Sequence, residues 1–188
     1  MDSADRSDGC QSLTSIASRK MSDLKRGEMQ AATQLEIRRA GSDDAQAIAD
    51  VLRASFLEFE ALYTEGGFGA TTPGPEQVAL RLREGPAWVA LFGNVMMGTV
   101  AATIKDGSVH IRGMAVLPVS RGSGVGTNLL QHVEGWAVEK GYRRLFLGTT
   151  PFLNSAIRLY DKFGFRRIDD LHDLFGTPLR TMEKVVSK

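Results

Sequence analysis

The 188-residue sequence predicts a single α/β (α+β) domain, in which helices cover both faces of a mixed central β-sheet. Short apolar strands near the middle of the chain are joined by tight glycine turns, which indicates antiparallel pairing. A helix-length segment separates the strand at 109–116 from the strand at 143–149, so these two strands are expected to run parallel. Amphipathic helical patterns on either side of these strands supply the covering layers.

Composition excludes several classes of protein. A hydrophobic share of 43% with 24% charged residues suits a soluble domain with a substantial core. A net charge of +1 argues against a nucleic-acid partner. The single cysteine, Cys10, allows neither an internal disulfide nor a thiolate metal cluster, and no metal site is expected. With no apolar run of membrane-spanning length and no hydrophobic signal core, we expect a cytoplasmic protein without a membrane partner.

The chain divides into a leader, residues 1–33, and a domain, residues 34–188. The leader is rich in Ser, Asp, Lys, Arg and Gln and has few large apolar side chains. So little apolar burial cannot offset the entropy lost on ordering the backbone. We therefore expect a disordered or loosely attached leader.

The first half of the domain begins with an alternating strand at Leu35–Arg39. A helix follows, with Ser42 as its expected N-cap. We interpret 64–75 as a mobile loop, because glycines and prolines interrupt the pattern there. A second, short helix is expected from Pro75 to Gly85. The apolar residues of these helices that we expect to face the core are Ile48, Leu52, Phe56, Phe59, Val78, Leu82 and Leu80.

The second half begins with a three-stranded antiparallel meander at 87–92, 95–104 and 109–116, turned by Gly93-Asn94 and Asp106-Gly107. A helix with apolar residues at helical spacing follows to Gly141, which ends it. A buried strand is expected at 143–149, and another helix begins at Asn154. Strands at 165–168 and 179–186 close the sheet.

The most informative stretch of the chain is a loop of alternating glycines at 122, 124 and 126 that opens into a helix. Glycine permits a left-handed backbone and a close approach to main chain. The amides of Gly122 to Thr127 are then expected to converge at the helix N-terminus, which favours an anion such as a diphosphate. The loop lacks the lysine of a Walker loop, and Thr127 stands where a dinucleotide fingerprint needs glycine.

The loop and a second motif resemble the GCN5-related N-acetyltransferase (GNAT) superfamily. Arg121-Gly122-Ser123-Gly124-Val125-Gly126, preceded by Met-Ala-Val-Leu-Pro, is similar to the family's pyrophosphate loop. Downstream, Asn154-Ser155-Ala156, Leu159-Tyr160 and Phe163-Gly164-Phe165 are similar to its second cofactor segment, N-x-A…L-Y-x-K-x-G-F. The resemblance covers about residues 35–186. It implies the GNAT-like fold, acetyl-coenzyme A as cosubstrate, and the homodimer that members of the family often form.

The resemblance also implies which residues hold the cofactor. The pantetheine arm would pair with the main chain of Met114, Ala115 and Val116. The alternative is that these residues only form an ordinary strand of the core. The diphosphate would be held by Arg121, although an exposed loop arginine is common, and by the loop itself. The complete set of cofactor residues is Met114, Ala115, Val116, Arg121, Gly122, Ser123, Gly124, Val125, Gly126, Thr127, Asn154, Ala156 and Tyr160.

Tyr160 is the candidate catalytic acid, because the resemblance places a phenol near the departing thiolate; the alternative is a core aromatic. His110 is the candidate base, since we expect it to share a face of its strand with Arg112, Met114 and Val116. Glu58, Glu60 and water are the alternatives for the base. No cysteine lies near these motifs, so direct transfer in a ternary complex is expected, without an acyl-enzyme.

These features predict an acetyl-CoA-dependent N-acetyltransferase acting on a primary amine of a small molecule, peptide or protein. The alternatives are an acyl-CoA-binding regulatory protein without turnover, and an α/β binding module whose glycine loop only turns the chain. Acceptor specificity is expected in the stretches 56–75 and 171–177. Glu58, Glu60 and Glu65 hint at a cationic acceptor, but a solvated acidic face explains them equally well.

Overall fold

A seven-stranded sheet organises the part of the chain that the computed structural model describes, residues 34–186 without the side chains of 169–171. The predicted leader, with Cys10, lies outside these residues. The strand order is β1-β2-β3-β4-β5-β7-β6. The strands are β1 (Leu35–Arg39), β2 (Ala87–Phe92), β3 (Val95–Lys105), β4 (Ser108–Val116), β5 (Arg144–Thr149), β6 (Arg166–Leu174) and β7 (Thr177–Val185).

The sheet is mixed, as predicted. Among the strands of residues 34–186, only β4 and β5 pair in parallel, and every other neighbouring pair is antiparallel. The parallel pair is the one whose connection contains a helix, because a short turn cannot return the chain to run in the same direction. The α+β fold class with helices on both faces is confirmed.

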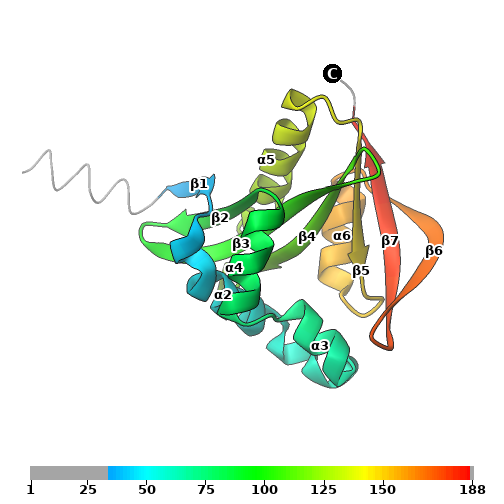
Figure 1. Ribbon diagram of the computed structural model, residues 1–188, viewed down its shortest axis with the longest axis horizontal. Helices are drawn as coiled ribbons and strands as arrows, with labels where there is room; N and C mark the ends of the chain where they lie inside the picture. Colours follow the sequence, from blue (N-terminus) through cyan, green and yellow to red (C-terminus); the bar gives the residue numbers. More distant parts are fainter. Residues whose placement is uncertain (1–33, 187–188) are drawn as a thin grey trace, which may run out of the picture.

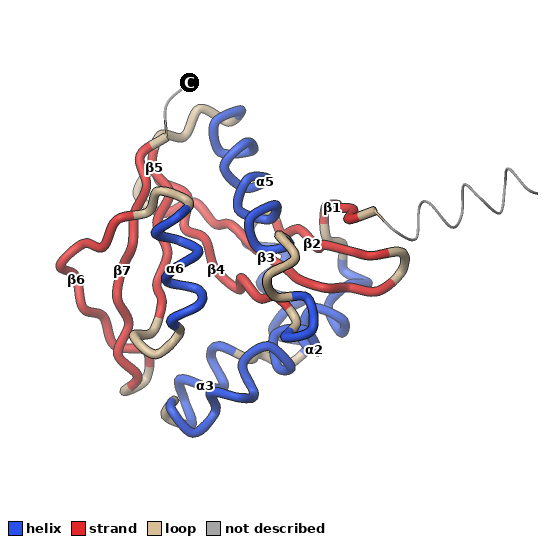
Figure 2. Tube along the Cα trace, turned by 180° about the vertical axis from the view of Figure 1, so that it is seen from behind, coloured by secondary structure: helices blue, strands red, loops and turns tan. Residues whose placement is uncertain are grey.

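Helices cover both faces of the sheet (Figures 1 and 2). On one face, α2 (Ala45–Phe56) and α4 (Pro75–Glu84) enclose a core that includes Val89 and Ala115. On the other face, α5 (Val125–Glu139) and α6 (Asn154–Lys162) enclose a larger core that includes Leu145 and Phe165. The remaining helical segments are η1 (Ser42–Asp44), η2 (Leu57–Leu62), α3 (Glu65–Thr71) and η3 (Pro118–Ser120).

Three details of the first helical region differ from expectation. Gly41, not Ser42, caps the entry, because the Gly41 amide donates to the Asp44 carboxylate at 2.8 Å. The stretch interpreted as a mobile loop contains the helix α3, whose N-cap is Thr64. Leu80, expected in the core, is 50% exposed, whereas Val78 is buried.

No helix of residues 34–186 combines the length and the apolarity that crossing a bilayer requires. Over the same residues, no group of three or more His, Cys, Asp or Glu side chains is arranged to hold a metal ion.

Candidate active site

The parallel strands β4 and β5 pair over only part of their length. Residues Val109–Ile111 pair with Leu145–Leu147, and beyond them no residue of β4 pairs with β5 among the described residues. Strand β5 continues to Thr149 with β7 as its partner, and β4 continues to Val116 with β3 as its partner. The sheet is therefore open in its middle, at the C-terminal end of both parallel strands.

A bulge at Gly113 changes the direction of the side chains on β4. The pairing of β3 with β4 shifts between Thr99 and Ala101, and Gly113 has a φ of 56°. Such an extra residue reverses which face the following side chains meet. Before the bulge, Ile111 lies in the α5 core; after it, Met114 and Val116 pack against that core, and Ala115 lies in the α2–α4 core.

The expectation that His110 shares a face with Met114 and Val116 is therefore wrong, because counting by twos ignores the bulge. His110 instead stacks on the Phe146 ring, with centroids 4.7 Å apart. Its pKa is lowered by burial, and further by Arg112 and Lys105. The imidazole is consequently neutral at neutral pH, the form that a general base needs, but it lies where β4 and β5 are still paired.

The glycine loop adopts the predicted geometry at the start of α5. Gly122 and Gly124 have φ values of 80° and 87°, in the left-handed region that glycine favours. The first helical bond runs from the Asn128 amide to the Gly124 carbonyl at 3.0 Å. Within residues 34–186, the amides of 122–127 make no main-chain hydrogen bond of good geometry. Residues 121–124 are exposed, so these donors are suited to bind an anion.

Gly126 brings three of the predicted cofactor segments together. A Cβ on Gly126 would lie 2.9 Å from Leu159 Cδ2 of α6 and 3.5 Å from Met114 Cε of β4. A side chain at this position would displace the end of the Leu159 side chain. The start of α5, Met114 and Val116 of β4, and Leu159 of α6 therefore lie close together.

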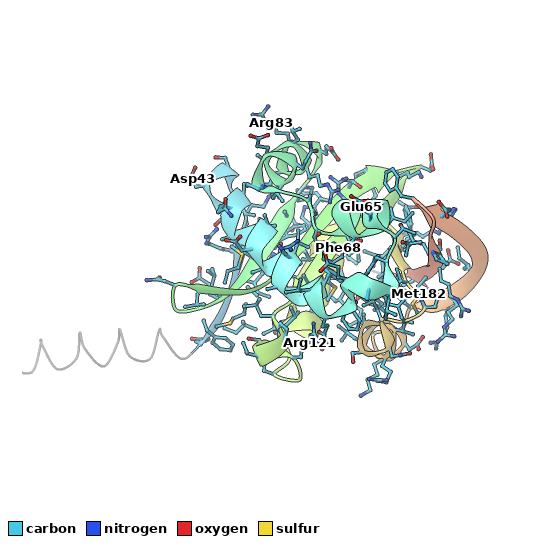
Figure 3. All side chains as sticks on the ribbon, turned by 90° about the horizontal axis from the view of Figure 1, so that it is seen from below. Asp43, Glu65, Phe68, Arg83, Arg121 and Met182 are labelled. Carbon is cyan, nitrogen blue, oxygen red and sulfur yellow. The ribbon has the colours of Figure 1, made fainter. Side chains whose placement is uncertain are left out.

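The Arg121 side chain contacts residues outside the glycine loop. Its guanidinium pairs with the Glu58 carboxylate and donates to the Ser55 carbonyl at 2.8 Å. Seen from below, Arg121 lies between the α2–η2 segment and the start of α5 (Figure 3). Contact with a diphosphate remains a prediction for Arg121. Since Glu58 is held in this pair, Glu60, which is exposed, is the freer of the two alternative bases.

Tyr160 lies on α6 and is only 7% exposed. Its ring meets Phe165 edge to face, with centroids 5.9 Å apart. Burial raises the pKa of the Tyr160 phenol, and the neighbouring Tyr63 raises it further. The phenol is therefore fully protonated at neutral pH, which is the form that a general acid needs.

Sequence reasoning missed Tyr63, which lies after η2 and contacts the β5–α6 connection. Its ring meets Phe152 edge to face at 4.8 Å. Burial raises the pKa of Tyr63, while the nearby Thr150 and Thr71 hydroxyls lower it. Tyr63 lies close enough to Tyr160 to raise its pKa, although the two residues belong to distant segments of the chain. The only local signal was an aromatic residue at the end of a helical pattern.

Two hydroxyls at the end of β5 were also missed. Thr149 Oγ1 is buried and makes no hydrogen bond within the described residues, whereas Thr150 Oγ1, also buried, faces the Tyr63 hydroxyl without a hydrogen bond of good geometry. Buried polar groups are nearly always paired, since an unpaired one loses its hydration without compensation. Their place, where β5 has separated from β4, makes them candidate contacts for a bound substrate.

The two stretches expected to determine acceptor specificity lie side by side. The Thr64 amide donates to Thr177 Oγ1 at 3.0 Å, and Thr64 Oγ1 donates to the Phe175 carbonyl at 2.6 Å. A Cβ on Gly67 would lie 2.2 Å from Thr177 Oγ1, so this contact requires glycine in α3. Figure 1 shows α3 next to the turn between β6 and β7, at the end of the sheet where it is open.

Comparison with known proteins gives a consistent result. Residues 48–165 match the family described as "Acetyltransferase (GNAT) family". The uncharacterized N-acetyltransferase YjgM of Escherichia coli is 31% identical over 139 residues, which cover 71% of this chain and 83% of YjgM. N-acetylaspartate synthetase of Danio rerio is 35% identical over 88 residues, 46% of this chain. The chain spans only 31% of the length of that relative.

Solved structures share the fold. The PaiA N-acetyltransferase of Thermoplasma acidophilum in complex with coenzyme A has a TM-score of 0.70 at 19% identity, covering 82% of this chain and all of that one (100%). YncA of Salmonella typhimurium with acetyl-CoA has a TM-score of 0.65 at 21% identity, covering 82% of this chain and 95% of that one. The family match extends over more than half of the sequence, and the chain therefore belongs to the GNAT family of acetyl-CoA-dependent N-acetyltransferases.

Proposed function

We propose that this chain transfers the acetyl group of acetyl-CoA directly to a primary amine while both substrates are bound. The observation that carries the proposal is the run of amides at 122–127 without main-chain acceptors, next to the opening between β4 and β5. Holding two reactants in line supplies much of the rate of such a transfer, because the entropy of bringing them together is lost on binding rather than in the reaction.

The residues present fit the cosubstrate. The loop amides and the N-terminus of α5 would hold the diphosphate, and the main chain of Met114–Val116 would pair with the pantetheine arm. When bound, acetyl-CoA supplies an acyl group activated as a thioester. Arg121 would release Glu58 and make a charge-assisted contact with the diphosphate instead. Breaking the pair with Glu58 costs little free energy, because both of its side chains are partly exposed.

Tyr160 would give its proton to the departing thiolate, and His110, Glu58, Glu60 or water would take the proton from the ammonium of the acceptor. Burial raises the pKa of Tyr160, so the phenol is protonated at neutral pH, as the first role requires. The lowered pKa of His110 supports the second, because the imidazole is uncharged at neutral pH.

Tyr160→Phe tests the acid. Removing only the hydroxyl is expected to lower kcat about 100-fold, within the range of general acid catalysis, and to leave the Kd of acetyl-CoA unchanged. Tyr142→Phe is the matched control, because Tyr142 packs on Trp136 near the C-terminal end of α5. Steady-state thiol release and calorimetry measure the two quantities, and an unchanged kcat would exclude the role.

The function itself is tested by titrating acetyl-CoA in a calorimeter and by thiol release with peptides, polyamines, amino acids and aminoglycosides. Binding together with amine-dependent thiol release is expected. Binding without release from any amine would favour the acyl-CoA-binding regulator. If acetyl-CoA does not bind, the proposed function is wrong.

A further inference from the structure

A small cavity lies on the α2–α4 face of the sheet, outside the motifs described above. Its volume is about 30 Å³, room for one small polar group, and it lies between α2, α4 and the strands β3 and β4. Most of its lining is apolar, but the side chains of Arg81 and Arg112 also reach it. Two guanidinium groups at one small cavity are unusual, because a buried charge is costly unless it is paired.

Positive charge exceeds negative charge at this cavity. Arg112 pairs with Glu84 and donates to the Arg81 carbonyl at 3.3 Å, while its Nε is buried without an acceptor. Arg81 donates to the Ala70 carbonyl at 3.0 Å and makes no ion pair within the described residues. Burial, and then the charge of Arg112, lower the pKa of Arg81. Two cations thus share one carboxylate.

That carboxylate is replaceable. The Glu84 side chain is 52% exposed, compared with 24% for Arg112. Glu84 can therefore move into solvent at little cost, whereas Arg112 cannot follow it without leaving the cavity. A guanidinium holds a carboxylate with two parallel N–H donors, and the unpartnered Nε of Arg112 is one donor of such a fork.

The cavity adjoins the opening of the sheet. Arg112 and Gly113 both line it, and they directly precede Met114–Val116, the segment of β4 that has left β5. A strand advances about 3.3 Å per residue. If Arg112 holds the carboxylate of a substrate, an amine two or three bonds away in the same molecule can therefore reach the opening between β4 and β5.

We propose that the acceptor is an amine that itself carries a carboxylate, and that Arg112, with Arg81, binds this carboxylate in exchange for Glu84. The proposal rests on the proposed function and specifies its substrate class. It replaces the cationic acceptor that Glu58, Glu60 and Glu65 hinted at, because all three of these side chains are exposed to solvent, whereas Arg112 lines a cavity.

Thiol release with matched acceptors tests this. Aspartate and glutamate are compared with asparagine and glutamine, and glycine with glycinamide, so that each pair differs in one carboxylate. The wild type is expected to prefer the member with the extra carboxylate in at least one of these pairs. Arg112→Met and Arg81→Met are expected to raise the KM of that acceptor at least tenfold. Arg83→Met, an exposed arginine of the same helix turn, is the control and should leave it unchanged.

Succinate, which has no amine, provides a readout independent of turnover. It is expected to bind the wild type and Arg83→Met in calorimetry, and to bind Arg112→Met at least tenfold more weakly. If Arg112→Met does not fold, Glu84→Gln serves instead; it removes the competing charge and should tighten succinate binding severalfold.

The two proposals fail separately. Loss of acetyl-CoA binding would overturn the proposed function but would leave the succinate titration informative. Turnover of amines with no preference for a carboxylate, or equal succinate affinity in Arg112→Met and Arg83→Met, would overturn the arginine site alone.

Discussion

The loop at residues 121–127 and the α3 contact, formed by residues 64–71 with 175–177, show two ways in which one chain builds a binding region. In the loop, consecutive residues place their own main-chain amides at the start of α5. In the α3 contact, side chains from distant parts of the chain meet, as Thr64 meets Thr177. The first depends on local backbone conformation, and the second depends on the completed fold.

Glycine serves both regions, but for different physical reasons. Gly124 is needed for its dihedral angle, with φ at 87°. Gly67 is needed for space, because a Cβ there would lie 2.2 Å from Thr177 Oγ1. A substitution at Gly124 therefore strains the backbone, whereas one at Gly67 pushes two elements apart. The same residue type in a sequence does not indicate which of these applies.

The largest effect is expected on acetyl-CoA binding when the loop is altered. Gly124→Ala and Gly141→Ala both place a methyl group on a left-handed residue, with φ of 87° and 84°, at opposite ends of α5. Each should lose about 1–2 kcal/mol of stability. Only Gly124→Ala, which alters the loop itself, should also raise the Kd of acetyl-CoA at least tenfold. Thermal unfolding and calorimetry measure these changes, and equal Kd values for both variants would contradict anion binding by the loop.

Thr64→Val breaks the α3 contact. Thr64 Oγ1 accepts from the Gly67 amide at 3.0 Å as the N-cap of α3, and donates to the Phe175 carbonyl. Losing both bonds should destabilise the domain by about 1–2 kcal/mol. Thr72→Val removes one local bond, from Thr72 Oγ1 to the Phe68 carbonyl, and should cost less. Urea unfolding compares the two, and an equal loss would show that Thr64 stabilises only its own helix.

Alkaline pH should have the smallest effect, and it tests the tyrosine pair between the two regions. The pKa of Tyr160 and that of Tyr63 are both raised in the folded chain. An unfolded tyrosine ionises near pH 10, so above about pH 10 the unfolded state loses protons that the folded state retains. The contribution of the two tyrosines to stability should therefore be constant below that pH and fall as the pH rises further.

Urea unfolding between pH 9 and pH 11 measures this slope. Tyr160→Phe should reduce it, and Tyr142→Phe should not. A slope that is identical in the wild type and Tyr160→Phe would show that Tyr160 ionises normally.

The contrast between the two regions also explains what could be predicted from the sequence. The glycine loop and the strand–helix order around it were predictable, because consecutive residues determine them. The helix α3 was not, since Gly66, Gly67 and Gly69 disfavour a helix locally and the contacts of Thr64 with 175–177 stabilise it. Arg81 and Tyr63 belong to no motif, and only the fold brings them to Arg112 and Tyr160.

The prediction that His110 shares a face of β4 with Met114 was wrong for a more specific reason. Gly113 forms a bulge in β4. Strict alternation of side chains along a strand holds only where no such bulge intervenes. One residue with positive φ was enough to place His110 and Met114 on opposite faces of the sheet.

The separation of β4 from β5 has a consequence for the sheet as a whole. Main-chain donors and acceptors along the inner margins of these two strands lack the partners that an uninterrupted sheet would supply. A sheet interrupted in this way favours an extended guest that completes its hydrogen-bond ladder, and any other strand with free edges would compete for the same place. A ligand that hydrogen-bonds to these main-chain groups would connect the two halves of the sheet. Ligand and protein would then become more rigid together.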